Sequence, residues 1–362
     1  MKNCSFWKRI FRVSKNEKQS TMKIKFYKVI IFSDNPLTTK YKFENRFQIY
    51  PYTSPNAPYS DKVKLHPIAL EYWVDEDIEV KVPEEFKGLE SFYKQSVTSM
   101  LPQTKILSLL SSLSNYRFFL PQIKWQWFCS IPNGDNPDEA NNQKSVAGLN
   151  TYWYPESYAE RQINDFSNPD FPQMNLKPHP EYFRNISLDE NEEIVFPEYI
   201  SVALHNYYAL SEQIKQIVEA ASSLINNGIA LRGTMNSLSY ISFISSIETL
   251  VDFEFKNEAV KKCECCGTSQ YRVMGKFRDF IFKYVSTAAE TKKQINEIYG
   301  LRSKIAHSGE LLLADNIYNW GDDTIRSEQW KIHLSAMQLS RVALTNWLLG
   351  AAKNENIAKV AK

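Results

Sequence analysis

Two residues near the end of one segment, Arg302 and His307, have side chains that could do chemistry on an anion. The segment 295–309 predicts a helix, because three isoleucines and Arg302 recur in it at three- and four-residue steps. Arg302 therefore interrupts an apolar stripe, and a guanidinium there needs an acceptor. It must find either a carboxylate in the core or a cleft that takes an anion.

The end of this helix decides whether the two side chains can meet. Ser308 and Gly309 predict its C-terminal stop. On an ideal helix His307 would lie roughly 140° away from Arg302, but local unwinding near Gly309 would bring both toward one opening. An imidazole that titrates near neutral pH suits general acid–base catalysis, and a guanidinium fork can bridge two oxygens of a phosphate.

A second interpretation gives both residues a structural role. Glu248 lies on another expected helix, 236–252, and could pair with Arg302 inside a helical bundle. His307 could simply cap the helix end, where a cation is favoured. Glu248 would then be either a residue that orients Arg302 or a purely structural one, and the sequence leaves both open.

The segment around Arg302 and His307 resembles the Arg-x4-6-His motif of the HEPN superfamily, whose small helical domains occur in many prokaryotic ribonuclease toxins. Ser303 fits the small polar residue that the family favours after the arginine. The segment 240–250, with Glu248, is similar to the earlier core helix of the family, which carries an inward acid. The order of the helices is most similar to the ApeA-like HEPN branch, and the resemblance covers roughly residues 200–355.

The resemblance implies a metal-independent endoribonuclease. In this family two protomers place their Arg–His pairs across a twofold axis and bind single-stranded RNA, such as a tRNA loop. The ribose 2′-hydroxyl attacks phosphorus and leaves a 2′,3′-cyclic phosphate, with Arg302 and His307 as the catalytic residues and Glu248, Ser303 and Tyr299 supporting them. The implied setting is a toxin or effector of antiphage abortive infection, with a phage-derived trigger sensed by the N-terminal domain.

The alternative from another class is a HEPN-type module without catalysis, which dimerises or binds a partner in a regulatory or sensory role. The feature that separates the two is the environment of Arg302 and His307. A shared open cleft favours the nuclease, and burial against Glu248 favours the module.

Composition limits the number of domains and the class of protein that the chain can be. With 362 residues, the chain is expected to form two domains. Its net charge of +2 is too small to imply a general nucleic-acid binder, so any basic surface must be local. The five cysteines do not resemble a secreted disulfide framework, and no apolar run approaches a membrane span, so we expect a cytoplasmic protein. Cys263 and Cys266 form half a zinc knuckle; reduced thiols without a cofactor are the simpler interpretation.

The chain in order predicts an α+β protein with a strand-rich mixed N-terminal domain and an all-α C-terminal bundle. We expect a basic tail over 1–22, an α+β domain over 23–198 and a helical domain over 199–362, where prolines disappear and helical periodicity begins. Strands are expected over 23–32, 41–50, 66–74 and 118–128, and helices over 105–113, 202–226, 236–252, 271–285, 295–309 and 328–352.

Overall fold

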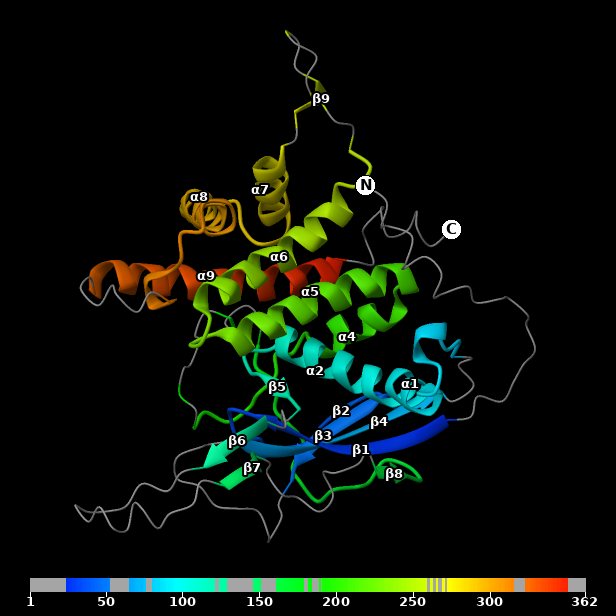
Figure 1. The fold of residues 1–362 in the computed structure, drawn as a ribbon. Helices are drawn as coiled ribbons and strands as arrows, with labels where there is room; N and C mark the ends of the chain where they lie inside the picture. The colour runs from blue at the N-terminus through cyan, green and yellow to red at the C-terminus, as the bar shows by residue number, and fades with distance from the viewer. Residues whose placement is uncertain are drawn as a thin grey trace, which may run out of the picture. The chain divides into compact units, whose positions relative to one another are not determined.

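The computed structural model describes most of the chain outside its two ends. The described residues are 24–52, 65–75, 80–120, 124–128, 146–150, 161–178, 182–183, 189, 191–258, 261–262, 265, 269–270, 272–315 and 323–350. The predicted basic tail over 1–22 lies outside them. The described chain is α+β, with an antiparallel sheet in its N-terminal part and helices in its C-terminal part, as predicted (Figure 1).

The chain divides into two compact units. The first comprises the residues up to Phe32 with 37–104 and 119–173, and the second comprises 33–36, 105–118 and 174–362. The expected boundary at residue 198 differs from this division, because 174–198 belong to the helical unit. So does most of α2 (Leu101–Leu113), which contains the helix expected over 105–113.

The sheet is built from segments whose side chains are buried. Its order is β2–β3–β4–β1–β5, and β8 also pairs with β1. The central strands have fully buried residues such as Ile31, Ile49 and Leu70, which accounts for their β-branched and aromatic composition. The strands are β1 (Ile24–Ser33), β2 (Tyr41–Phe43), β3 (Phe47–Pro51), β4 (His66–Asp75), β5 (Phe118–Phe119) and β8 (Arg161–Ile163).

The prediction of strand structure across 41–50 is corrected by a tight turn. Glu44 has a φ of 47°, in the left-handed region, and the Arg46 amide donates to the Phe43 carbonyl at 3.0 Å. The turn lets β3 fold back antiparallel onto β2. The expected strand 118–128 is likewise divided into β5 and β6 (Lys124–Phe128), and β6 pairs with β7 (Val146–Asn150). Further short elements of this part are α1 (Glu90–Gln95), a 3-10 turn at Glu84–Phe86 and a π turn at Ser96–Met100.

The second unit is helical. Its helices are α4 (Ile200–Ala209), α5 (Glu212–Leu231), α6 (Asn236–Glu254), α7 (Val273–Tyr284), α8 (Ala289–Ser303) and α9 (Asp323–Gly350), with a short hairpin of β9 (Lys261–Lys262) and β10 (Ser269–Gln270). The helices predicted over 236–252, 271–285 and 328–352 are therefore confirmed to within a few residues. Figure 1 shows α6 running beside α5 and α9.

The single helix predicted over 202–226 is wrong in two respects. The chain leaves the helical conformation at Leu210 and Ser211, whose ψ values are both 154°, and α5 begins after Ser211. Serine is a favoured residue at this position before a helix. At the other end, the Asn226-Asn227-Gly228 sequence does not stop the helix, which continues to Leu231.

Gly228 serves close helix packing and not a turn. A Cβ added to it would lie 2.5 Å from Cε1 of Phe243 on α6, so only glycine leaves room for that ring. Ser239, also on α6, donates its hydroxyl to the Gly228 carbonyl at 2.6 Å. These contacts bring α5 against α6. Ser239 and Phe243 lie on the face of α6 opposite to Glu248, as their spacing along the helix implies.

Candidate functional site

The Arg302 helix ends in an unusual turn. α8 stops at Ser303, and residues Lys304–Ser308 continue it as a π-helix. Gly309 then has a φ of 67° and its amide donates to the Lys304 carbonyl, which ends the helix in the left-handed conformation that glycine allows. The predicted stop at Ser308 and Gly309 is confirmed. Single π turns within helices are frequent at functional sites.

This turn removes the angular separation expected on an ideal helix. A π-helix closes its hydrogen bonds between residues five apart, so Arg302 and His307 come onto one side of the helix. Nη1 of Arg302 lies 3.1 Å from Nε2 of His307. Because a guanidinium can only donate, Nε2 must be the acceptor, and the imidazole in this arrangement is neutral with its proton on Nδ1.

A carboxylate on α6 holds the arginine. Nη2 of Arg302 donates to Oε2 of Glu248 at 3.1 Å, and the side chains of the two residues are 22% and 20% exposed. The other oxygen of Glu248 accepts the Tyr299 hydroxyl at 3.1 Å. The guanidinium also lies over the Tyr299 ring, with Cζ 5.7 Å from its centroid. Arg302 is thus oriented by one ion pair and one aromatic face.

Tyr299 connects this group to the core. Burial and the adjacent Glu248 carboxylate raise the pKa of its phenol, so the hydroxyl remains a donor at neutral pH. Its ring packs against Phe277 of α7 at 5.0 Å between centroids. One residue earlier, the Ile298 carbonyl accepts the buried Tyr240 hydroxyl at 2.6 Å. These contacts fix α8 against α6, and therefore fix Arg302 relative to Glu248.

Arg302 and His307 have different environments. Arg302 does pair with Glu248, and the isoleucines of its stripe, Ile295, Ile298 and Ile305, are buried. His307 is exposed, and so is Ser303 at the last position of α8. The guanidinium contacts the core on one side and an exposed imidazole on the other. A ligand approaching His307 from solvent would therefore also meet Arg302.

A second group of residues in the same unit was not anticipated. His333 on α9 is 2% exposed, and its Nε2 lies 2.8 Å from the Ser239 hydroxyl of α6. It lines a cavity of about 320 Å³. The sequence signal was present, since Arg326, Gln329, Trp330 and His333 recur at helical spacing and all line this cavity. It was hidden because aromatic residues on a buried helix usually indicate only core packing.

The proposed zinc half-site cannot be placed, because Cys263 and Cys266 lie outside the described residues; Cys265 between them is exposed. Within the described ranges, no three His, Cys, Asp or Glu side chains gather in a way that could hold a metal ion. None of the described helices combines the length and the apolar character needed to cross a membrane. No family model, curated protein or solved structure matches the chain.

Proposed function

We propose that this chain is a metal-independent endoribonuclease of the HEPN type, in which Arg302 and His307 act on a phosphodiester of single-stranded RNA. The observation that carries the proposal is the 3.1 Å contact between the two side chains, made at a π turn with His307 exposed. The family motif depends on residue types and spacing, whereas the contact depends on geometry, so each supports the same pair independently.

His307 supplies the proton chemistry. In the neutral form implied by its contact with Arg302, Nε2 has one lone pair, which accepts the Arg302 N–H. When that N–H turns to a phosphate oxygen of the bound RNA, the lone pair can take the proton of a ribose 2′-hydroxyl. The oxygen freed of its proton then attacks the adjacent phosphorus and forms the cyclic phosphate, while the bond to the 5′-oxygen breaks. Dependence on the 2′-hydroxyl restricts the reaction to RNA.

Arg302 stabilises the charge that develops on phosphorus. Its contacts with Glu248 and His307 use two N–H directions of the fork, and the remaining N–H groups can donate to the phosphate oxygens. The Glu248 carboxylate partly neutralises the guanidinium, which weakens its general attraction for anions. Its benefit is orientation, because a fork already held in place loses less entropy when it binds.

A leaving 5′-oxygen needs a proton donor as well as the base. One protomer contributes one imidazole to this site, so a homodimer that pairs two Arg302–His307 sites would provide both the base and the acid. In such an assembly the exposed side of α8 would face its symmetry mate. The first unit is proposed to restrain or trigger the nuclease. The expected signal is a phage component, as in abortive infection.

The second candidate function is a HEPN-type dimerisation or binding module without catalysis. The Arg302–Glu248 pair favours it to a degree, because an arginine with a carboxylate partner already has a structural reason to be present. That pair gives no reason for the π turn or for the position of His307 above the guanidinium. For this reason the nuclease is the preferred proposal.

The test is cleavage of bulk tRNA by purified protein in the presence of EDTA. The wild-type chain should generate discrete fragments, and His307→Ala should generate none while unfolding at nearly the same temperature, because His307 is exposed. Wild-type protein that leaves every RNA intact with and without EDTA, and is harmless on expression, would favour the binding module.

A further inference from the structure

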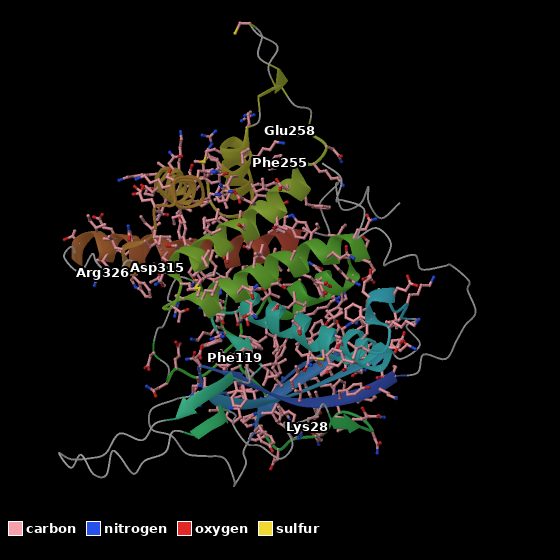
Figure 2. The ribbon with its side chains drawn as sticks, viewed as in Figure 1. Lys28, Phe119, Phe255, Glu258, Asp315 and Arg326 are labelled. Carbon is pink, nitrogen blue, oxygen red and sulfur yellow. The ribbon has the colours of Figure 1, made fainter. Side chains whose placement is uncertain are left out.

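The cavity next to His333 is a candidate binding site that the proposed cleavage reaction does not use. It is lined by α9, by the start of α6 and by the 312–314 segment, all within the helical unit. Figure 2 labels two residues in this region, Asp315 and Arg326. Its volume of about 320 Å³ falls at the lower end of the range of small-molecule pockets, about 300–1,000 Å³.

The cavity offers an aromatic wall. Trp330 lines it and remains 39% exposed, so part of the indole is open to a ligand. Arg232 lies against the same ring, with Cζ 5.9 Å from the centroid. An indole supported by a cation is a good surface for stacking a planar heterocycle.

Two residues on α9 add a hydrogen-bond donor and an acceptor. Oε1 of Gln329 accepts the Leu313 amide at 2.8 Å, so the oxygen must point that way and the NH2 group is left to donate. The Ser239 hydroxyl donates to the Gly228 carbonyl and therefore accepts from Nε2–H of His333. An imidazole protonated on Nε2 presents a lone pair on Nδ1.

The imidazole stays neutral at physiological pH. Burial, with the nearby Arg232 charge, lowers the pKa of His333 to about 4, against the smaller opposing effect of Asp315. The Asp315 carboxylate itself is occupied by the start of α6, where it accepts the Asn236 amide at 2.7 Å and the Ser237 amide at 2.5 Å. The neutral imidazole of His333 and the amide of Gln329 are therefore polar groups of the cavity wall, whereas the Asp315 carboxylate is already bound.

Gln329 and His333 are four residues apart and share one face of α9. An amide donor beside an imidazole acceptor, next to a partly exposed indole, complements the edge and the face of a nucleobase. We propose that this cavity binds a nucleobase, stacked on Trp330 and hydrogen-bonded through Gln329 and His333.

The base could belong to the RNA strand held at Arg302 and His307 or to a free nucleotide, and the first case rests on the proposed function. The cavity begins at Leu312, five residues after His307. Five residues span at most about 18 Å, so the two sites lie within reach of one strand, about five nucleotides at a stacked spacing of about 3.4 Å. A base bound here would hold the RNA in register relative to the scissile linkage.

The test measures binding to the full chain carrying His307→Ala, in EDTA, so that cleavage does not enter. One arm titrates the free nucleosides and their monophosphates by calorimetry, and the other titrates short fluorescent RNA homopolymers by anisotropy. Gln329→Glu retains an acceptor for the Leu313 amide and replaces the NH2 donor with a charged oxygen that can only accept, while Trp330→Leu removes the stacking surface. Gln213→Glu, in the exposed first turn of α5, makes the same chemical change away from the cavity.

Each cavity substitution should weaken binding about tenfold or more, and Gln213→Glu should leave it unchanged. Weakening in the nucleoside arm assigns the cavity to a free nucleotide, and weakening confined to the RNA arm assigns it to a base of the strand. If Gln329→Glu and Trp330→Leu bind both ligands as the control does, the proposal is overturned. Because no arm depends on cleavage, a chain that proves inactive as a nuclease still gives a decisive result here.

Discussion

Replacing Glu248 with glutamine should destabilise the helical unit by about 2 kcal/mol. The carboxylate accepts Arg302 on one oxygen and the Tyr299 hydroxyl on the other, both at 3.1 Å. A glutamine amide has a single oxygen, so one of these donors loses its partner and the NH2 group faces a donor instead. The pair is about one fifth exposed on each side. Its loss should therefore cost more than a surface pair, about 0–1 kcal/mol, and less than a fully buried one, about 3–5 kcal/mol.

Two further substitutions calibrate this value. Tyr299→Phe removes only the hydroxyl from the same carboxylate, and should cost about 1 kcal/mol. Glu297→Gln makes the same change as Glu248→Gln on the same bundle, but its partner Lys293 is 83% exposed and 3.9 Å away. It should change stability by less than about 0.5 kcal/mol.

The assay is urea unfolding of the full chain at neutral pH, with the midpoint and slope measured for each variant. Glu248→Gln should lower the midpoint clearly, Tyr299→Phe should lower it by about half as much, and Glu297→Gln should match wild type. If Glu248→Gln and Glu297→Gln unfold at the same midpoint, the carboxylate does not hold Arg302 in solution, and the argument for a positioned guanidinium is refuted.

Three other results are expected. Arg302→Lys keeps a charge for Glu248 but lacks the fork of the guanidinium. RNA cleavage should therefore fall by about 10²–10³, while the unfolding midpoint changes little. Cleavage within threefold of wild type, a factor worth only about 0.7 kcal/mol, would contradict this. Gly228→Ala places a methyl 2.5 Å from the Phe243 ring and should cost about 1–3 kcal/mol of unfolding free energy; an unchanged thermal midpoint would show that the helices separate easily. The pKa of His333 is about 4 in the folded chain and 6.5 ordinarily, so between these pH values only the unfolded chain binds the extra proton. Stability should therefore fall by on the order of 3 kcal/mol as pH drops from 6.5 to 4. A His333→Gln variant with the same pH dependence of stability would argue against this assignment.

The elements that carry the site were predictable because their patterns are local. A stripe of isoleucines containing one arginine predicts the helix that α8 and its π turn form, and Gly309 predicts where that turn ends. The pairing of Arg302 with Glu248 was one of two open alternatives, since helical periodicity places both residues inward but cannot say which helices are neighbours. The α+β class followed from a change in composition along the chain.

Other features required the tertiary structure. The π turn at 304–308 has no residue signature, because it depends on how the helix end packs. The sequence predicts a helix end at residue 226, whereas α5 continues through Gly228, which the Phe243 ring on another helix requires. The break before Ser211 reflects the end of one packed helix and the start of the next. The His333 cavity depends on α6 and the 312–314 segment, which only the fold brings to α9.

The most direct measurement of the central claim is the chemical nature of the RNA ends. Wild-type protein should cut single-stranded RNA in EDTA and leave a 2′,3′-cyclic phosphate and a free 5′-hydroxyl, because the attacking group is the ribose hydroxyl activated by His307. The same RNA with a 2′-deoxy substitution at the cut should remain intact. Fragments ending in a 3′-hydroxyl and a 5′-phosphate, or cleavage that requires a divalent metal, would contradict the account.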